Sequence, residues 1–123
     1  MPKGNSFLLA AVLACPVAAL AIASNNESNS SLFERRCSGC HSLDKDKIGP
    51  RLRDVYGRTS GAVPGFNYSQ ALKKRRITWD EQSLDKWLAD PDEFLPENEM
   101  SFQVIDKNER SRIIAYLKQV SGR

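Results

Sequence analysis

The chain has 123 residues, which is enough for one domain of ordinary size and a short leader, and 41% of them are hydrophobic. Its 18 basic residues barely outnumber its 15 acidic residues, and a net charge of +3 argues against a nucleic-acid partner. A domain this small buries only a modest fraction of its surface, which limits the core that side chains alone can build.

An apolar stretch lies near the N-terminus, from residue 7 to residue 23, with Lys3 as the only charge before it. Its last residues, Ala21-Ile22-Ala23, match an A-x-A cleavage site. We therefore expect residues 1–23 to be a signal peptide and the mature protein to lie in the periplasm. Retention of the leader as a membrane anchor is the alternative, because the stretch is near the shortest length that spans a bilayer.

The mature chain begins with a polar stretch rich in serine and asparagine, residues 24–31, which is typical of a flexible segment. Ser31-Leu32-Phe33-Glu34 fits the S-x-x-E capping box and predicts that a short helix begins at this serine. We expect the folded domain to extend over residues 32–123.

Cys37-Ser38-Gly39-Cys40-His41 has the C-x-x-C-H pattern of covalent c-type haem attachment. Each thiol can add across one vinyl group of haem, and the imidazole that follows is then directed at the iron. Because His41 is the only histidine in the chain, no other imidazole competes for this role. The motif predicts one haem c bound by Cys37 and Cys40, with His41 as an axial ligand of the iron.

A Cys-x-x-Cys pair also occurs in thioredoxin-like redox proteins and in zinc sites. The thioredoxin-like motif accompanies a βαβ pattern, whereas the hydrophobic spacing of this sequence predicts no strands. A structural zinc site needs about four cysteine or histidine ligands. Outside the leader, which contains Cys15, only Cys37, Cys40 and His41 are available. The sequence therefore favours haem over both alternatives.

Glycine and proline recur between residues 42 and 64, which predicts loops rather than a continuous element. A short helix is expected over residues 69–74. Thr78-Trp79-Asp80-Glu81 offers a second capping box, for a helix that ends near Asp90-Pro91. This helix would carry one apolar face, formed by Leu84, Trp87 and Leu88.

Met100 follows a segment that contains Pro91 and Pro96, which restrict the backbone there to a short helical turn and an extended loop. A methionine thioether is a soft sulfur donor, and a Met/His pair is the iron ligation of electron-carrying haem proteins. We therefore expect Met100 to be the second axial ligand.

The last predicted element is a terminal helix that begins at the capping arrangement Asp106-Lys107-Asn108-Glu109. Its apolar stripe at helical spacing consists of Ile113, Tyr116, Leu117 and Val120. Together the elements predict an all-α fold, in which a few helices and wrapping loops surround one cofactor.

Five short stretches after the haem motif occur in an order that is typical of a known family. They are Lys47-Ile48-Gly49-Pro50, Val55-Tyr56-Gly57-Arg58, Pro64-Gly65-Phe66-Asn67-Tyr68, Ile77-Thr78-Trp79 and Ile114-Ala115-Tyr116-Leu117. In this order they resemble the class I cytochromes c, and among these the type shared by mitochondria and purple bacteria. The resemblance implies the class I cytochrome c fold and a protein that carries single electrons.

The resemblance also implies roles for residues around the haem. Pro50 matches the position whose carbonyl accepts a hydrogen bond from the proximal histidine. Arg58, Tyr68 and Trp79 match positions that pair with or hydrogen-bond to the buried haem propionates. Phe102 matches the ring that covers the exposed haem edge.

Three positions depart from the family's pattern. Trp87 occupies the place of a tyrosine beside the methionine sulfur, so the hydroxyl donor there is missing and the reduction potential should change. Leu72 replaces an asparagine that helps to hold a buried water, and Asn98 replaces a threonine beside a propionate. Phe33 and Tyr116 keep the family's aromatic contact between the first and last helices.

Around the haem edge the resemblance predicts lysines that steer the protein onto acidic partners. Residues 85–99 instead contain one lysine and six acidic side chains, which are Asp85, Asp90, Asp92, Glu93, Glu97 and Glu99. We therefore expect a redox partner whose docking face is mixed or partly basic, and a weaker response to salt than in a lysine-ringed relative.

The expected function is that of an exported, monomeric electron carrier and not of an enzyme, because His41 and Met100 would fill both axial positions of the iron. The resemblance implies a quinol-oxidising complex as donor and a terminal oxidase, reductase or reaction centre as acceptor, with no small-molecule substrate. Two alternatives stay open. One is a haem-based ligand sensor or peroxidase-like enzyme with a labile methionine, and the other is a membrane-tethered carrier.

Overall fold

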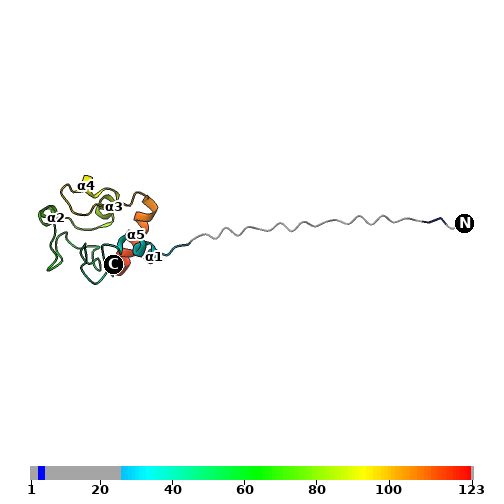
Figure 1. Ribbon diagram of the computed structural model, residues 1–123, viewed down its shortest axis with the longest axis horizontal. Helices are drawn as coiled ribbons and strands as arrows, with labels where there is room; N and C mark the ends of the chain where they lie inside the picture. Colours follow the sequence, from blue (N-terminus) through cyan, green and yellow to red (C-terminus); the bar gives the residue numbers. More distant parts are fainter. Residues whose placement is uncertain (1–2, 5–25, 123) are drawn as a thin grey trace.

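The computed structural model describes residues 3–4 and 26–122. Apart from Lys3 and Gly4, the expected signal peptide therefore lies outside the described residues. The described part of the chain contains helices and no named strand, as the all-α prediction requires (Figure 1). The helices are α1 (Asn29–Cys37), α2 (Gln70–Arg75), α3 (Glu81–Ala89), α4 (Pro91–Phe94) and α5 (Lys107–Val120). Among the described residues, no helix is long and apolar enough to cross a bilayer.

The first and last helices, α1 and α5, lie against each other, and α5 also packs on α3 (Figure 1). The rings of Phe33 and Tyr116 meet with their centroids 5.1 Å apart, which confirms the predicted contact between these helices. Leu32 and Ile113 are completely buried beside them. Burial of these apolar side chains, each contributing roughly 1.5–3 kcal/mol, joins the two ends of the domain.

Helix α1 begins earlier than its capping pattern predicted, so the choice of Ser31 as N-cap is wrong. The N-cap is Ser28, whose side chain accepts a hydrogen bond from the backbone N–H of Ser31 at 3.1 Å. Contacts with α5 explain the difference, because Arg112 donates to the Glu27 carbonyl and to Asn29 Oδ1. The first helical turn is therefore fixed by tertiary contacts that the local sequence does not contain.

The predicted start of helix α3 is wrong in the other direction: the helix begins later than predicted, and its N-cap is Asp80 and not Thr78. Asp80 accepts from the Ser83 N–H at 2.8 Å, and the Ser83 hydroxyl accepts from the Asp80 N–H at 2.8 Å. Trp79 would be the first helical residue after a cap at Thr78, but its N–H donates to Arg58 O and its carbonyl accepts from the Gly57 N–H, so the helix cannot begin there. The remaining helices start and end close to the predicted positions.

Backbone hydrogen bonds between residues 57–60 and 77–79 close a long loop, and we call this pairing the neck. The N–H of Gly57 donates to Trp79 O at 2.6 Å, and the N–H of Trp79 donates to Arg58 O at 2.9 Å. The N–H of Ser60 donates to Ile77 O at 2.7 Å. The neck returns the chain to the domain after an excursion that contains α2.

The segment between α4 and α5 is fixed at its downstream end by a buried arginine. Arg110 on α5, only 9% exposed, donates to the carbonyls of Val104 and Ile105 at 3.0 and 2.7 Å. It also pairs with the Asp85 carboxylate on α3 at 2.7 Å. Because the Val104 N–H donates to Leu88 O at 2.8 Å, this part of the loop has a defined position beside α3.

Candidate haem site

A cavity of about 380 Å³ lies between the helices and the loops that follow α1. Apolar side chains from α3, α5 and the first loop form much of its wall, namely Leu52, Val55, Leu84, Leu88, Ile113 and Leu117. Ten of the predicted site residues line this same cavity. They are Cys37, Cys40, His41, Pro50, Arg58, Tyr68, Trp79, Trp87, Met100 and Phe102.

The two thiols lie on a tight turn at the end of α1. The N–H groups of Cys40 and His41 both donate to the carbonyl of Cys37, at 3.1 and 2.8 Å. The turn therefore brings the whole motif to one side of the cavity. Burial raises the pKa of the Cys37 thiol to about 12, whereas Cys40 is exposed.

His41 is oriented by the loop that follows it. Its Nδ1 lies 2.8 Å from the carbonyl oxygen of Pro50, and because a carbonyl can only accept, Nδ1 carries the hydrogen. Burial lowers the pKa of His41, which favours the neutral ring. A neutral imidazole with Nδ1 engaged in this way has Nε2 as its available metal-binding atom.

Gly49 approaches the same ring closely. A Cβ atom at Gly49 would lie 2.2 Å from Cε1 of His41, and the Gly49 N–H donates to the Cys40 carbonyl at 2.8 Å. Only glycine fits between the imidazole and the backbone here. The sequence analysis used this residue only as part of a matching stretch and did not predict the contact.

Met100 contributes its thioether from the loop after α4. The indole Nε1 of Trp87 donates a hydrogen bond to its sulfur at 3.1 Å. The sequence correctly indicated that the family's tyrosine hydroxyl is missing, but the indole N–H takes over as donor. Trp87 is 7% exposed, and its ring lies near those of Trp79 and Phe94, with centroids 5.4 and 6.4 Å apart.

The residues expected near the propionates also line the cavity. Arg58 donates to the carbonyls of Arg53 and Arg51 at 3.1 and 3.0 Å, and burial lowers its pKa. The Tyr68 hydroxyl accepts from the N–H of Val63 at 3.1 Å. A guanidinium has five N–H donors, so Arg58 retains donors for a carboxylate. No ion pair joins Arg58 to an acidic side chain within the described residues.

Asn98 makes contacts that the resemblance did not imply. It is absent from the described residues that line the cavity, and its side chain binds the backbone of the methionine loop instead. The Oδ1 atom accepts from the Met100 N–H at 2.7 Å. No sequence pattern distinguished this role, because it depends on how the chain folds back on α4.

The chemistry of the cavity fits a covalently bound haem. Two thiols from one turn, a neutral imidazole and a thioether surround an apolar space, and at its wall lies a guanidinium that pairs with no carboxylate of residues 26–122. Among the residues that the structure describes, no three histidine, cysteine, aspartate or glutamate side chains gather as a metal-ion site.

Comparisons with known proteins agree with this site. A family model described as Cytochrome c matches residues 29–121. Cytochrome c of Euglena viridis is 46% identical over 95 residues, which cover 75% of this chain and 93% of the relative. Cytochrome c of Chlamydomonas reinhardtii is 40% identical over 95 residues, covering 74% of this chain and 85% of the relative.

A solved structure is also similar. Cytochrome cH from Methylobacterium extorquens superposes with a TM-score of 0.70 at 39% sequence identity, over 74% of this chain and 94% of that chain. The helices of the described residues thus follow the class I cytochrome c fold. With a family match over three quarters of its length, the chain belongs to the cytochrome c family, whose members bind covalent haem c and carry electrons.

Proposed function

We propose that this protein is an exported carrier of single electrons, with haem c attached through Cys37 and Cys40 and the iron ligated by His41 and Met100. The supporting observation is that these four sulfur and nitrogen donors line one apolar cavity. Bound haem supplies the one-electron chemistry, and the protein supplies axial ligands and burial. If His41 and Met100 both bind the iron, no position would remain on it for a substrate, so we expect an electron carrier and not an enzyme.

The chain's own residues prepare both ligands. The Pro50 carbonyl keeps the hydrogen of His41 on Nδ1 and directs Nε2 toward the cavity. Trp87 donates to the Met100 sulfur, which has a second lone pair available for a metal. Two ligands that are oriented in advance need little movement when the iron changes its charge, and this favours fast electron transfer.

Arg58, Tyr68 and Trp79 would bind the haem propionates. Arg58 keeps N–H groups for a carboxylate, and Tyr68 and Trp79 are 8% and 7% exposed. A buried carboxylate is tolerated when it is paired and hydrogen-bonded, and these three side chains offer both kinds of partner.

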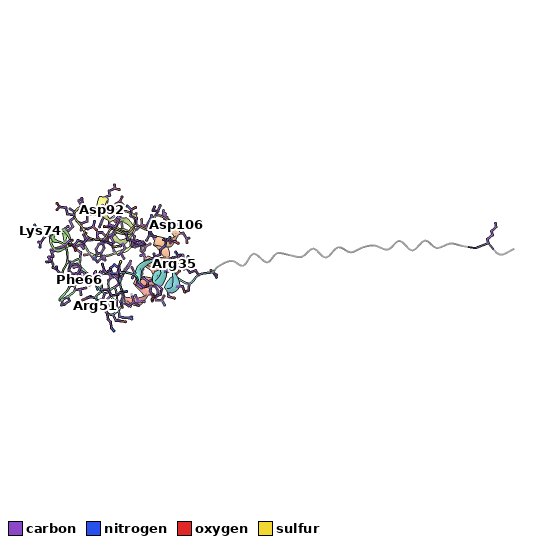
Figure 2. All side chains as sticks on the ribbon, viewed as in Figure 1. Arg35, Arg51, Phe66, Lys74, Asp92 and Asp106 are labelled. Atoms are coloured by element: carbon purple, nitrogen blue, oxygen red, sulfur yellow. The ribbon has the colours of Figure 1, made fainter. Side chains whose placement is uncertain are left out.

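The open side of the cavity is where we place the redox partner. Ile48 and Phe102 line the cavity and are 79% and 38% exposed, which makes an apolar rim. Helix α4 carries the acidic side chains Asp92 and Glu93, and α2 carries basic side chains such as Lys74; Asp92 and Lys74 both lie at the periphery of the domain (Figure 2). We expect a partner face with basic groups, on a quinol-oxidising complex as donor and an oxidase, reductase or reaction centre as acceptor.

Optical spectra of the purified holoprotein test the ligation. The oxidised form should show the weak near-infrared charge-transfer band of a methionine–iron bond, and the reduced form should not bind carbon monoxide. Met100→Ala should abolish the band and admit carbon monoxide, whereas the neighbouring Ser101→Ala should behave as the parent. A parent protein without the band that binds carbon monoxide readily would support the ligand sensor or peroxidase-like enzyme instead.

Export is tested by the mass and location of the mature protein. We expect cleavage after Ala23 and recovery in the periplasmic fraction, as a monomer. A mature protein that keeps residues 1–23 and requires detergent for extraction would be the membrane-tethered carrier.

A further inference from the structure

The methionine loop lacks ordinary backbone support. Residues 96–103 make no backbone–backbone hydrogen bond within the described part of the chain, between the Leu95 N–H at one end and the Val104 N–H at the other. Glu97 also has a positive φ of 65°, which is unfavourable for a residue with a side chain. Something other than secondary structure must therefore fix the position of Met100.

The Asn98 side chain provides this support through three hydrogen bonds. Its Oδ1 accepts from the Met100 N–H at 2.7 Å. Its Nδ2 donates to the Leu95 carbonyl at 2.9 Å and to the Asp92 carboxylate at 2.9 Å. All of these groups belong to α4 or to the loop that follows it, so one amide ties the methionine backbone to the helix.

The donor and acceptor pattern fits an amide and no smaller side chain. A flipped amide would place two N–H donors against the Met100 N–H and an oxygen against two other oxygens, so only one orientation is possible. A threonine hydroxyl has a single hydrogen to donate, so it cannot donate to both the Asp92 carboxylate and the Leu95 carbonyl while accepting from Met100. The family's residue at this position therefore cannot make the same three bonds.

The base of this support is itself capped and well packed. Asp90 caps α4 by accepting from the Glu93 N–H at 3.0 Å, and Pro91 is fully buried. Leu95 is only 6% exposed, and the Phe94 ring lies near Trp87, the donor to the Met100 sulfur. Asn98 binds the backbone of Met100 and Trp87 binds its sulfur, and both contacts rest on the packed residues of α4.

From this geometry we infer that Asn98 is a positioning residue, which holds Met100 in place as an axial ligand by fixing its backbone to α4. The inference depends on the proposed function, because it gives Asn98 a role in ligation only if Met100 binds the iron. Without Asn98 the loop would open more often, and an external ligand would compete more easily for the iron.

Imidazole titration of the oxidised holoprotein measures this opening, since added imidazole binds only when Met100 has left. Loss of these bonds in Asn98→Ala should raise the apparent imidazole affinity by roughly tenfold, which is the size of effect expected from the net loss of one typical hydrogen bond. Asn98→Thr should give a smaller increase. The control Glu93→Gln alters an exposed side chain of the same helix and should match the parent.

Denaturant unfolding of the same variants separates positioning from general stability. We expect the fold-change in imidazole affinity of Asn98→Ala to exceed the fold-change in its unfolding equilibrium constant, because the lost bonds hold the loop and not the whole domain. If Asn98→Ala and Asn98→Thr bind imidazole within twofold of a parent that shows the methionine–iron band, the inference is wrong and the proposed ligation stands. If the parent itself lacks the band, the proposed ligation fails and the inference fails with it.

Discussion

Replacement of Gly49 by alanine should disturb the proximal histidine directly. The added Cβ would lie 2.2, 2.6 and 2.7 Å from Cε1, Nδ1 and Nε2 of His41. The ring has to move by roughly 1.5 Å to reach an ordinary carbon–carbon contact distance. Movement of the backbone instead would displace Pro50, the next residue, so either change stretches the 2.8 Å hydrogen bond from Nδ1 to the Pro50 carbonyl.

The expected loss of stability follows from two contributions. Overpacking of a well-packed site costs roughly 1–3 kcal/mol, and the weakened hydrogen bond adds about 1 kcal/mol. For a domain of this size, a loss of about 2–4 kcal/mol lowers the melting temperature by roughly 10–20 °C. Gly49→Ala should therefore be folded at room temperature but much less resistant to heat.

Thermal unfolding of the holoprotein, followed by haem absorbance, measures this loss. Gly39→Ala is the matched control, because a Cβ at Gly39 meets no atom within 4 Å. We expect this control to melt within a few degrees of the parent. A Gly49→Ala protein that melts with its control and keeps the parent spectrum would show that the imidazole does not pack on this backbone.

Three further changes test other contacts. Trp87→Phe removes the N–H donor to the Met100 sulfur, which makes the sulfur a stronger donor to oxidised iron. The reduction potential should fall by roughly 20–40 mV in a redox titration, and an unchanged potential would exclude this effect. Arg110→Met leaves the Val104 and Ile105 carbonyls without their donor, and should cost roughly 1–3 kcal/mol in denaturant unfolding, with little added by Asp85 because its side chain is 40% exposed; an unchanged unfolding free energy would contradict this role of Arg110. Electron transfer to a basic partner should slow modestly with ionic strength, whereas rates that fall steeply with acidic partners would contradict the acidic docking face.

The local chemistry of the site could be predicted because it depends on covalent spacing. Cys37, Cys40 and His41 lie within five residues, so the sequence itself brings the thiols and the imidazole together. The structure then places Met100, far along the chain, at the same cavity. This long-range pairing came from ligand chemistry and family resemblance, since no local pattern specifies which loop reaches the cavity.

The helix starts show where local patterns are insufficient. Ser28 and not Ser31 is the N-cap of α1, because Arg112 of α5 binds the residues at the start of this helix. Asp80 and not Thr78 is the cap of α3 because the neck pairs the backbone of Trp79 with Gly57 and Arg58. In both cases a contact with a distant segment decided between neighbouring residues that could each serve as a cap.

The contacts of single side chains were the hardest to predict. Asn98 was expected beside a propionate, and its three hydrogen bonds to Asp92, Leu95 and Met100 depend on the turn after α4. The donor role of Trp87 requires that the indole edge face the sulfur, which residue type alone does not specify. Such roles depend on orientation and so become visible only in the folded protein.

The loop that the neck closes is a place where residues can be inserted or removed during evolution. Because backbone bonds at residues 57–60 and 77–79 close this loop, its ends keep their positions whatever the length between them. Doubling the length of a flexible loop costs only about 0.6 kcal/mol in closure entropy. Tyr68 and Leu72 line the cavity, but Arg75 and Arg76 are exposed at the end of α2. Insertions at that turn would enlarge the surface of the protein and leave the haem cavity unchanged.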